Sequence, residues 1–424
     1  MGEIQLPSHW KVVTLGDVAR IERGKFAHRP RNDPAFYGGD IPFIQTGDVT
    51  ASNGYVKNYA QTLNQKGLSV SKFFPKGTIV ITIAANIGYT AILEFDSAFP
   101  DSLIGITPNN KTIPVDAEYL NYYLWTQQLE MDRQAPRGTQ KNINIQFLNP
   151  WRVVVPPLPE QKTIAHTLRT IQKAKETRQR ELELERERKA ALMQYLFTHG
   201  TSNEPRGEKK IGKIPESWGI VPFKSITVSG TQNGIYKSKE FYGRGYQIAD
   251  MKDIFKGEVL EIGNMDKLDL DDEELAKFRL YEGDLIFARR SFKPEGAGKC
   301  QFIPTLKEPV VFSSSIIRVS LNKEIAEPRF YAYFFNSEIG NQLIRQITRI
   351  LAVSGISGSD LKNLLVPVLT QKEQKEIVAT LQNCDRKIQA LEKEIALTDE
   401  LFHAMLEQLM TGKISTQPLT ETYV

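Results

Sequence analysis

Cysteine and histidine are scarce in this sequence. Cys300 and Cys384 are the only cysteines among 424 residues, which excludes a disulfide framework and a thiolate-rich metal site. The five histidines are scattered along the chain, without the spacing that metal ligation requires. A chain with so few thiols suits a reducing compartment, and we therefore expect a cytoplasmic location.

Long apolar runs are also lacking. The most apolar segment, residues 78–93, is interrupted by Asn86 and Gly88, and residues 1–20 contain charges but no apolar signal-peptide core. We therefore expect neither a membrane span nor a secretion signal. The formal net charge of +4 is too small to indicate a nucleic-acid partner by itself, so the local placement of charge must decide.

Catalytic motifs occur only in incomplete form. Residues 207–213 (GEKKIGK) match the start of a phosphate-binding loop, but Ile214 stands where Ser or Thr would hold magnesium. Residues 296–298 (GAG) lack the third glycine of a dinucleotide-binding loop. Residues 149–151 (NPW) are similar to the Asn-Pro-Pro-aromatic motif of amino-methyltransferases, with tryptophan in place of the second proline. We expect that this chain catalyses no reaction and binds no cofactor or metal.

The sequence repeats itself. Residues 7–10 (PSHW) recur 208 positions later as residues 215–218 (PESW). Five further pairs follow in the same order: residues 41–49 and 246–254, 76–80 and 282–286, 119–124 and 330–335, 155–156 and 366–367, and 160–162 and 373–375. Six matches in one order indicate an internal duplication.

Each copy ends in a long segment with a helical pattern. In the second copy, apolar residues recur in steps of three and four from Ile377 to Leu409, which predicts a coiled-coil helix. In the first copy the pattern that starts at Ile164 is weaker, because charged residues interrupt it at four positions: Lys175, Arg178, Glu185 and Lys189. Gly200 and Gly412 are expected to end the two helices.

The bodies that precede the helices are of mixed character. Short β-branched runs at residues 78–84, 91–95 and 310–319 predict strands, and the aromatic segments at residues 119–125 and 330–335 predict helices that pack in a core. We therefore expect an α+β duplication of two α/β bodies, each followed by a long helix. The expected boundaries are a body at 1–158, a helix at 159–199, a polar linker at 200–213, a second body at 214–370, a second helix at 371–412 and a tail at 413–424.

A basic segment without acidic residues occurs in each copy. Residues 133–159 and 339–359 contain no Asp or Glu, which suits contact with phosphates and base edges, although a solvated helix end explains any single arginine equally well. The arginines in each segment are four positions apart, so we expect each pair to share one helical face. The candidates for DNA contact are Arg133, Arg137, Lys141 and Asn142 in the first copy, and Arg345 and Arg349 in the second.

Residues 289–293 (RRSFK) form a second candidate, a basic loop with an aromatic residue inside it, which suits guanine or phosphate contact. The first copy has residues 84–86 (AAN) at the equivalent place, so the two copies are expected to read different bases. The candidates here are Arg289, Arg290, Ser291, Lys293 and Asn86. Surface charge or ordinary loop hydrogen bonding explains equally well a further group: Arg29, Arg31, Gln45, Thr46, Lys237, Lys239, Asp250 and Lys252.

Together these features resemble the specificity subunits of Type I restriction-modification systems. The resemblance is carried by the two Pro-x-x-Trp segments, by residues 140–144 (QKNIN) and by residues 155–162 (VPPLPEQK), and it covers essentially the whole chain. The second copy departs from the pattern. Residues 367–374 (PVLTQKEQ) lack the double proline, and residues 354–357 (SGIS) replace the amide-rich segment.

The resemblance implies a non-catalytic subunit that recognises double-stranded DNA with a bipartite target. Each half of the target would be read by one target-recognition domain, and the two long helices would pack antiparallel as a coiled-coil spacer. Two modification subunits would dock on this frame, with or without two restriction subunits. S-adenosylmethionine, ATP and magnesium would belong to those partners.

Three alternatives stay open. The chain could be the specificity subunit of a Type IIB-like restriction-modification enzyme. A stand-alone DNA-binding regulator would share the basic loops but would not need two long helices with docking faces. A coiled-coil scaffold without DNA binding would not need acid-free segments in both copies.

Overall fold

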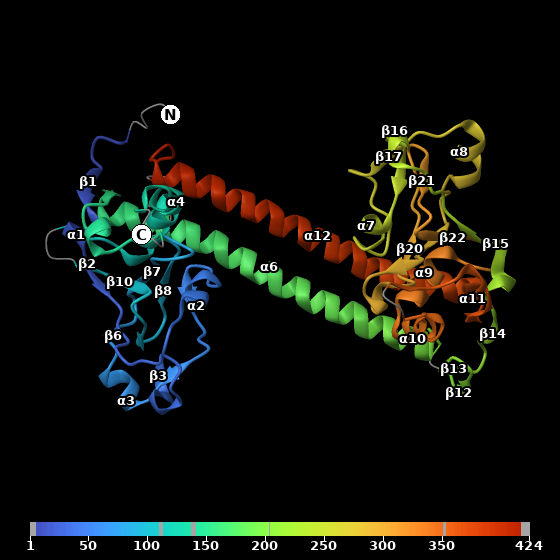
Figure 1. Ribbon diagram of the computed structural model, residues 1–424, viewed down its shortest axis with the longest axis horizontal. Coiled ribbons are helices and arrows are strands. Elements are labelled where there is room, and N and C mark those ends of the chain that lie inside the picture. The colour runs from blue at the N-terminus through green and yellow to red at the C-terminus, as the bar shows by residue number, and fades with distance from the viewer. Residues whose placement is uncertain (1–5, 110–112, 137–140, 203, 351–352, 417–424) are drawn as a thin grey trace. The chain divides into compact units, whose positions relative to one another are not determined.

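The computed structural model describes residues 6–109, 113–136, 141–202, 204–350 and 353–416. The chain forms two compact units: residues 1–179 with 393–424 make up unit 1, and residues 180–392 make up unit 2. Two long helices, α6 (Leu158–His199) and α12 (Gln371–Met410), contribute to both units (Figure 1). The predicted α+β duplication with two long helices is confirmed, but the boundary between the units falls inside both helices.

A five-stranded sheet forms the centre of unit 1. Its strand order is β2-β10-β7-β8-β4, and all neighbours are antiparallel except β8 and β4. In β7 (Ile79–Thr82), Ile79 lies in a core with helix α4, whereas Val80 lies in a separate core with Phe74 and Phe99. Alternate residues therefore point to opposite faces of the sheet, and both faces are covered.

The other elements of unit 1 before α6 are β1 (Lys11–Thr14), α1 (Leu15–Val18), β2 (Ala19–Arg23), η1 (Pro34–Phe36), β3 (Tyr37–Pro42), α2 (Thr46–Thr50), β4 (Tyr55–Val56), β5 (Thr62–Leu63), α3 (Gln65–Ser69), β6 (Phe73–Phe74), β8 (Thr90–Leu93), β9 (Ser97–Ala98), β10 (Leu103–Pro108), α4 (Ala117–Gln134), α5 (Ile145–Leu148) and β11 (Arg152–Val155).

Unit 2 repeats this plan. Its four-stranded antiparallel sheet has the order β15-β22-β18-β20, and a second sheet has the order β17-β16-β21. In β18 (Leu285–Ala288), Phe287 lies in a core with Phe335 of helix α9, whereas Ile286 lies in a separate core with Phe312. The strand pair β14 and β24 stands before α12 as β1 and β11 stand before α6.

The other elements of unit 2 are β12 (Arg206–Lys209), β13 (Gly212–Pro215), β14 (Gly219–Pro222), η2 (Phe223–Ile226), β15 (Thr227–Asn233), η3 (Lys239–Phe241), β16 (Tyr242–Ala249), α7 (Met251–Ile254), β17 (Asp266–Leu268), α8 (Asp272–Phe278), β19 (Arg290–Ser291), η4 (Pro294–Gly296), β20 (Cys300–Phe302), β21 (Val310–Phe312), β22 (Ile316–Leu321), α9 (Pro328–Asn336), α10 (Glu338–Ile347), β23 (Ser354–Gly355), α11 (Gly358–Asn363) and β24 (Leu365–Val368).

Helix α6 begins at a buried polar junction in unit 1. The side chain of Gln161, which is 0% exposed, accepts a hydrogen bond from the Asp116 N–H at 2.8 Å. Its amide group donates to the carbonyls of Pro114 at 3.1 Å and Pro156 at 2.8 Å. These three bonds join the start of α4, the end of β11 and helix α6, and they satisfy backbone groups that would otherwise be buried without a partner.

Helix α12 begins in unit 2 with the same arrangement. The side chain of Gln374, also 0% exposed, accepts from the Glu327 N–H at 2.7 Å and donates to the carbonyls of Ile325 at 3.0 Å and Leu369 at 2.9 Å. The repeat of residues 160–162 as 373–375 therefore has a structural cause: each copy needs this glutamine to seat its long helix.

The glutamate before each glutamine binds the tryptophan of a Pro-x-x-Trp segment. The indole Nε1 of Trp10 donates to Glu160 at 3.1 Å, and that of Trp218 donates to Glu373 at 3.1 Å. The two motifs that mark the duplication are thus the two sides of one contact, which recurs once in each unit.

Two glycines end the long helices, as the sequence predicts. Gly200 and Gly412 both have φ +67°, in the left-handed region that favours glycine. A Cβ atom at Gly412 would lie 2.5 Å from the ring of Pro7, and one at Gly200 would lie 2.5 Å from the carboxylate of Glu373 and 3.3 Å from Pro215. Each glycine therefore also allows a helix end to approach a Pro-x-x-Trp segment closely.

Charged pairs join the two long helices within unit 1. Lys175 pairs with Asp399, and the Nε of Arg178 lies 2.8 Å from Glu394. These are two of the four charged residues that interrupt the apolar pattern of the first helix. Both of these charged residues therefore have a partner of opposite charge on the second helix.

The other two interruptions are paired within unit 2. Glu185 lies 3.6 Å from the ammonium of Lys387, and the ammonium of Lys189 lies 2.7 Å from Asp385. Residue numbers on α12 fall as those on α6 rise, so the helices run antiparallel, as the resemblance implies. At these four positions the contact between the helices is made by ion pairs and not by apolar side chains. The apolar repeat that predicts a coiled coil is therefore weaker in the first helix.

Two segments differ from the sequence-based expectation. The predicted linker at residues 200–213 contains β12 and the first half of β13, which form a hairpin, and Ile211 and Ile214 bury this hairpin in the core of unit 2. The aromatic segment of the second copy is followed by a second helix, α10, whose first turn is capped by the Ser337 hydroxyl accepting the Gly340 N–H at 3.2 Å. The first copy has the single helix α4 there.

We expect Gln161→Ala and Gln374→Ala each to lower the free energy of unfolding by roughly 1–3 kcal/mol, because each change leaves buried backbone groups without partners. Urea unfolding followed by circular dichroism measures the effect. Gln194→Ala is the matched control, since Gln194 is exposed on α6. Equal stability of all three variants would show that the junction does not hold the helices.

Candidate nucleic-acid interface

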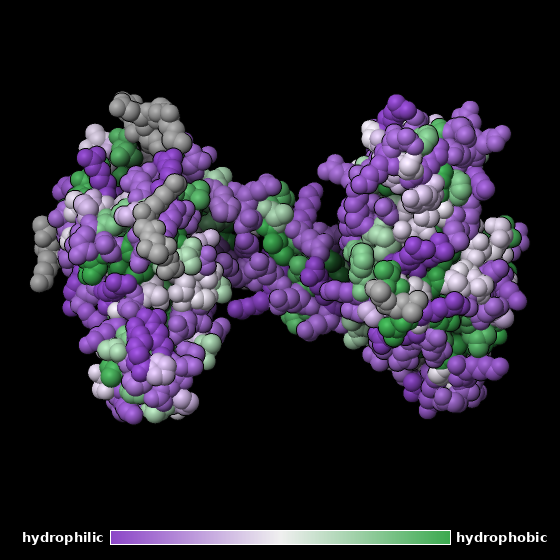
Figure 2. All heavy atoms as spheres, in the orientation of Figure 1, coloured by the Kyte–Doolittle hydropathy of each residue, from purple (hydrophilic) through white to green (hydrophobic). Residues whose placement is uncertain are grey.

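The visible surface of each unit is mainly hydrophilic, with smaller apolar patches (Figure 2). In unit 2 one set of exposed apolar side chains comes from loops that meet near strand β19. Phe292 is 89% exposed, Ile350 74%, Phe255 46% and Val353 41%. Solvent-exposed aromatic and aliphatic groups clustered in this way mark a surface for binding a partner.

The loop that carries Phe292 is fixed on both sides. Strand β19, formed by Arg290 and Ser291, pairs antiparallel with β23. The Ser291 hydroxyl, which is buried, accepts the backbone N–H of Lys293 at 3.1 Å. Because its neighbours are held in this way, Phe292 is presented to solvent by an ordered backbone.

The two arginines of this loop differ in their surroundings. The guanidinium of Arg289 donates to the Ser314 carbonyl at 3.2 Å, so it is partly committed to the fold. Arg290 is exposed, and neither it nor Lys293 has a side-chain hydrogen bond or an ion pair within the described residues. Arg290 and Lys293 are therefore available for an anionic partner.

A cavity of about 780 Å³ lies beside this loop. Met251, Phe255, Phe292 and Val353 supply its apolar lining. Its basic lining comes from Lys252, Arg290, Lys293 and Lys299, with Glu295 as the acidic group among the lining residues. The cavity therefore has both apolar and mainly basic lining residues.

Unit 1 has a cavity of about 710 Å³ with a different lining. Gln45 and Gln61 both line it, and the Gln45 amide donates to the Gln61 carbonyl oxygen at 3.1 Å. Arg31 also lines it and pairs with Asp101, which lies 3.7 Å from Arg29 as well. The lining of this cavity also contains Phe26, Tyr37 and Phe43, of which Phe26 and Phe43 are buried.

Gln45 and Asp250 hold equivalent positions, each just before a short helix. Gln45 caps α2 together with Asp48, and Asp250 caps α7. The Asp250 carboxylate accepts the Met251 N–H at 2.8 Å and the Ser313 hydroxyl at 2.6 Å. Both residues thus have a structural role in addition to the predicted base contact, and Thr46 and Lys252 lie on the same two helices.

Several predicted DNA-contacting cations are paired with carboxylates. Although the segments at residues 133–159 and 339–359 contain no acid, acids adjacent to them in space neutralise part of their charge. The pairs are Arg133 with Glu130, Lys141 with Asp132, Arg349 with Asp360, Lys237 with Glu274, and Lys252 with Asp266. A phosphate would have to compete with these carboxylates for each cation.

The remaining candidates lie on exposed positions. Asn86 and Asn142 are exposed in unit 1, and Asn142 bridges to Ala84 beside it. Lys239 and Arg345 are exposed in unit 2. Arg137 lies outside the described residues.

The expectation that Arg345 and Arg349 share a helical face is wrong. Helix α10 ends at Ile347, and Arg349 pairs through its backbone with Gly355. The four-residue spacing indicated a continuous helix, but the chain turns there to form the strand contact.

Sequence reasoning missed part of both surfaces. Gln61 and Phe255 line the cavities, yet each stands alone in the sequence without a motif. Met251 lies within the paralleled segment 246–254 but was not singled out. Phe292 was noticed only as part of its basic loop. One sequence signal could have identified Phe255. It directly follows residues 246–254, which repeat residues 41–49, and it lies on the same turn as Lys252.

The described residues contain no group of three or more His, Cys, Asp or Glu side chains that could hold a metal ion. Burial raises the pKa of both cysteine thiols, Cys300 and Cys384, so neither is a reactive thiolate at neutral pH.

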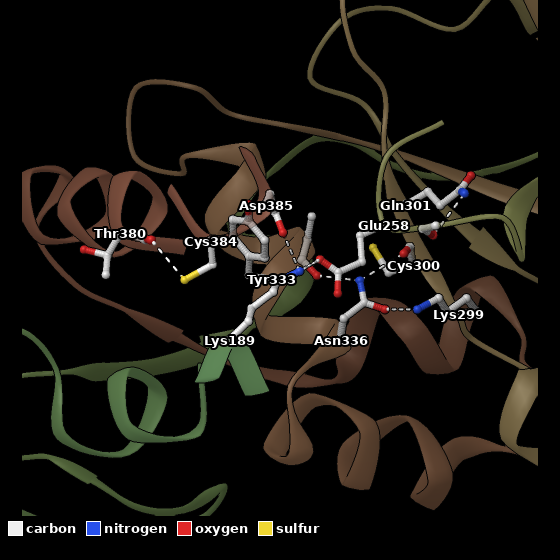
Figure 3. Close-up of polar contacts among 12 residues, drawn as sticks. Lys189, Glu258, Lys299, Cys300, Gln301, Tyr333, Asn336, Thr380, Cys384 and Asp385 are labelled. Carbon is white, nitrogen blue, oxygen red and sulfur yellow. Dashed lines mark hydrogen bonds and ion pairs between the residues drawn. The ribbon is translucent and has the colours of Figure 1, made fainter. Parts of the chain in front are cut away.

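A partly buried ionic cluster joins the body of unit 2 to its helix pair (Figure 3). Lys189 lies between Glu258, at 2.6 Å, and Asp385, at 2.7 Å, and the Tyr333 hydroxyl donates to Asp385. Burial disfavours the charge of Lys189, but the two carboxylates outweigh this effect and raise its pKa. In unit 1 the Tyr122 hydroxyl donates to the neutral Gln172 at 2.8 Å. The equivalent tyrosine hydroxyl therefore binds a charged carboxylate in unit 2 and a neutral amide in unit 1.

The two copies each match one protein family. The Type I restriction modification DNA specificity domain matches residues 7–186 and again residues 215–398. The chain belongs to this family. The duplication inferred from the sequence is therefore a pair of specificity domains, and the chain is the recognition component of a restriction-modification system and not its catalytic component.

Proteins similar to this specificity-domain chain agree with the assignment. The MjaVIII specificity subunit of a Type I restriction enzyme from Methanocaldococcus jannaschii is 23% identical over 99% of this chain and 96% of its own. A structure of a Type I restriction-modification S subunit from M. genitalium covers 96% of this chain and 97% of its own, with 16% identity and a TM-score of 0.56. A structure concerned with complex assembly and conformational transition of a type I system covers 97% and 100%, with 14% identity and a TM-score of 0.59.

Among the residues that the structure describes in this specificity-domain chain, no helix is both long enough and apolar enough to span a membrane. The long helices α6 and α12 carry charged residues throughout, which accounts for this result.

Proposed function

We propose that this chain reads a bipartite target in double-stranded DNA, one part with the body of each unit. The observation that carries the proposal is one scaffold used twice with different side chains at an equivalent loop. After β18 the chain has residues 289–293 (RRSFK), and after β7 it has residues 84–86 (AAN). A shared scaffold gives both copies the same approach to a duplex, whereas different loops select different bases.

The chemistry of the two surfaces suits different base edges. Arg290 has the planar pair of donors that recognises guanine in the major groove, and Gln45 and Gln61 have the paired donor and acceptor that recognise adenine. We assign phosphate contact to Arg345, Lys239 and Lys293, which are exposed. For the remaining sequence candidates we keep the proposed role of DNA contact. Where such a residue has a carboxylate partner described above, the DNA would displace that carboxylate.

We also propose that two modification subunits dock on this chain and that restriction subunits can join them. Helices α6 and α12 present exposed apolar side chains suited to docking, among them Leu184 at 64% and Leu397 at 53%. Support also comes from the similar chain in the structure concerned with assembly of a type I system. S-adenosylmethionine, ATP and magnesium are assigned to those partners and not to this chain.

The isolated chain should show no methyl transfer, no ATP hydrolysis and no DNA cleavage, because each cofactor motif in its sequence is incomplete. Equilibrium dialysis with labelled S-adenosylmethionine, and activity assays with and without the partner subunits, measure this. Stoichiometric binding of S-adenosylmethionine to the chain alone would contradict the assignment of cofactors to the partners.

Arg290→Ala should weaken DNA binding by roughly 1–3 kcal/mol through one half of the target if a bidentate base contact is lost. If Arg290 contacts a phosphate instead, the loss should be uniform across sequences and the salt dependence should fall by about one unit. Binding to half-site variants at several salt concentrations separates the two cases.

Arg289→Ala is the matched comparison, because Arg289 already donates to the Ser314 carbonyl and is less available to DNA. We expect it to reduce affinity less than Arg290→Ala does. An unchanged affinity and an unchanged salt slope in both variants would place this loop outside the interface.

A site logo selected by the chain with its partners should show two conserved blocks separated by a gap. We propose that α6 and α12 set this gap, since both helices contribute to both units. Deleting one heptad from each, residues 175–181 and 393–399, shortens each helix by about 10 Å. At ~3.4 Å per base pair, the gap should contract by about three base pairs.

This pair of deletions is matched, because it removes Lys175 and Arg178 together with their partners Asp399 and Glu394. The conserved blocks themselves should stay the same. A logo with an unchanged gap would show that the helices do not set the spacing, and a logo with one continuous block would contradict the bipartite target.

A further inference from the structure

The cavity beside β19 in unit 2 has a composition that DNA backbone contact alone does not need. Phosphate contact requires a cation, and Lys293 supplies one. It does not require Phe292, whose ring is 89% exposed and makes no ring-to-ring contact with the described residues. An apolar ring held in water by an ordered loop indicates a partner with an apolar face.

The cavity next to this ring has the size and lining of a small-ligand site. Its volume of about 780 Å³ falls in the range of sites that hold small organic groups. Met251, Phe255 and Val353 make its other apolar surfaces. Lys252 is paired with Asp266, but the other three basic residues that line the cavity outnumber Glu295, its acidic residue, so an anionic partner is favoured. A nucleobase attached to its phosphates combines a flat apolar face with negative charge.

We propose that this cavity receives one unstacked DNA base, which stacks on Phe292 while Lys293 holds the adjacent phosphate. This inference rests on the proposed function, since it specifies how unit 2 handles its half of the target. Proteins that insert a phenylalanine at a base step unstack that step, and an extruded base is usually held by aromatic side chains in a pocket.

The first copy has no counterpart. Residues 84–86 (AAN) carry no ring. The cavity of unit 1 is lined by rings, but Phe26 and Phe43 are buried and the Tyr37 hydroxyl donates to the Arg31 carbonyl, so none of them stands exposed in solvent as Phe292 does. The proposed unstacking of a base is therefore confined to the half of the target that unit 2 reads. Unit 1 reads its half from base edges without unstacking.

The test uses the full chain without partner subunits, because a methyltransferase would itself extrude a base. A duplex that carries the selected target is prepared with 2-aminopurine at each purine position in turn. We expect the fluorescence to rise on binding at one position, in the half read by unit 2, because 2-aminopurine brightens when it leaves the stack. Wild-type chain should also bind several-fold tighter when a mismatch is placed at that position, since a mismatched base is easier to unstack.

Phe292→Ala should abolish the fluorescence rise and weaken binding to the paired duplex about tenfold, the typical effect of losing one stacked base. The side chain is exposed, so the variant should unfold at the wild-type temperature. Tyr236→Ala is the matched control: Tyr236 is 83% exposed in the same unit but does not line the cavity, and this variant should keep both the signal and the affinity.

The outcomes separate the two proposals. If the full chain selects DNA by sequence but no position brightens, or if Phe292→Ala behaves like the Tyr236→Ala control, the base-receiving cavity is refuted and the proposed function stands. If the full chain selects no DNA sequence, both proposals are overturned.

Discussion

The seating of each long helix depends on one buried glutamine. Gln161 and Gln374 each satisfy one backbone N–H and two backbone carbonyls where a body meets its helix, and the bonds to the carbonyls of Pro156 and Leu369 are buried. Without such a side chain these backbone groups would lose their hydrogen bonds to water on folding and form none in exchange, which would destabilise the junction. The neighbouring glutamates extend it by binding Trp10 and Trp218. The fold can therefore vary its loops widely while this junction stays constant.

The helix pair shows how charge and register are combined. Lys175, Arg178, Glu185 and Lys189 stand where a purely apolar seam would place aliphatic residues, and each has a partner on α12. Ion pairs of this kind add little net stability when exposed, but a misregistered pairing would leave charges without partners. The pairs thus specify how the antiparallel helices align. The cluster around Lys189 extends the same principle to the body of unit 2 through Glu258.

The recognition surfaces are built on this constant frame by short loops. Equivalent strands, β7 and β18, deliver different side chains to equivalent positions, with alanine and asparagine in one copy and arginine and phenylalanine in the other. Many of the cations nearby are balanced by carboxylates, so the surface field is weaker than the sequence of each segment suggests. In the function that we propose, specificity rests on the few groups that remain available, such as Arg290, and on shape.

The sequence by itself determined the duplication, the α+β class, the two long helices and their glycine ends, because these depend on periodicity and on residue types that act locally. It did not reveal that Trp10 meets Glu160, or that Lys141 is paired with Asp132, since such contacts join positions that only folding brings together. The pairing of Arg133 with Glu130, three residues earlier on the same helix, is local and was overlooked. The sequence also misplaced the hairpin at β12 and β13, whose polar composition hides two buried isoleucines. Only the tertiary structure decided which loops border a cavity, because a cavity is the space left between elements and has no pattern of its own in the chain.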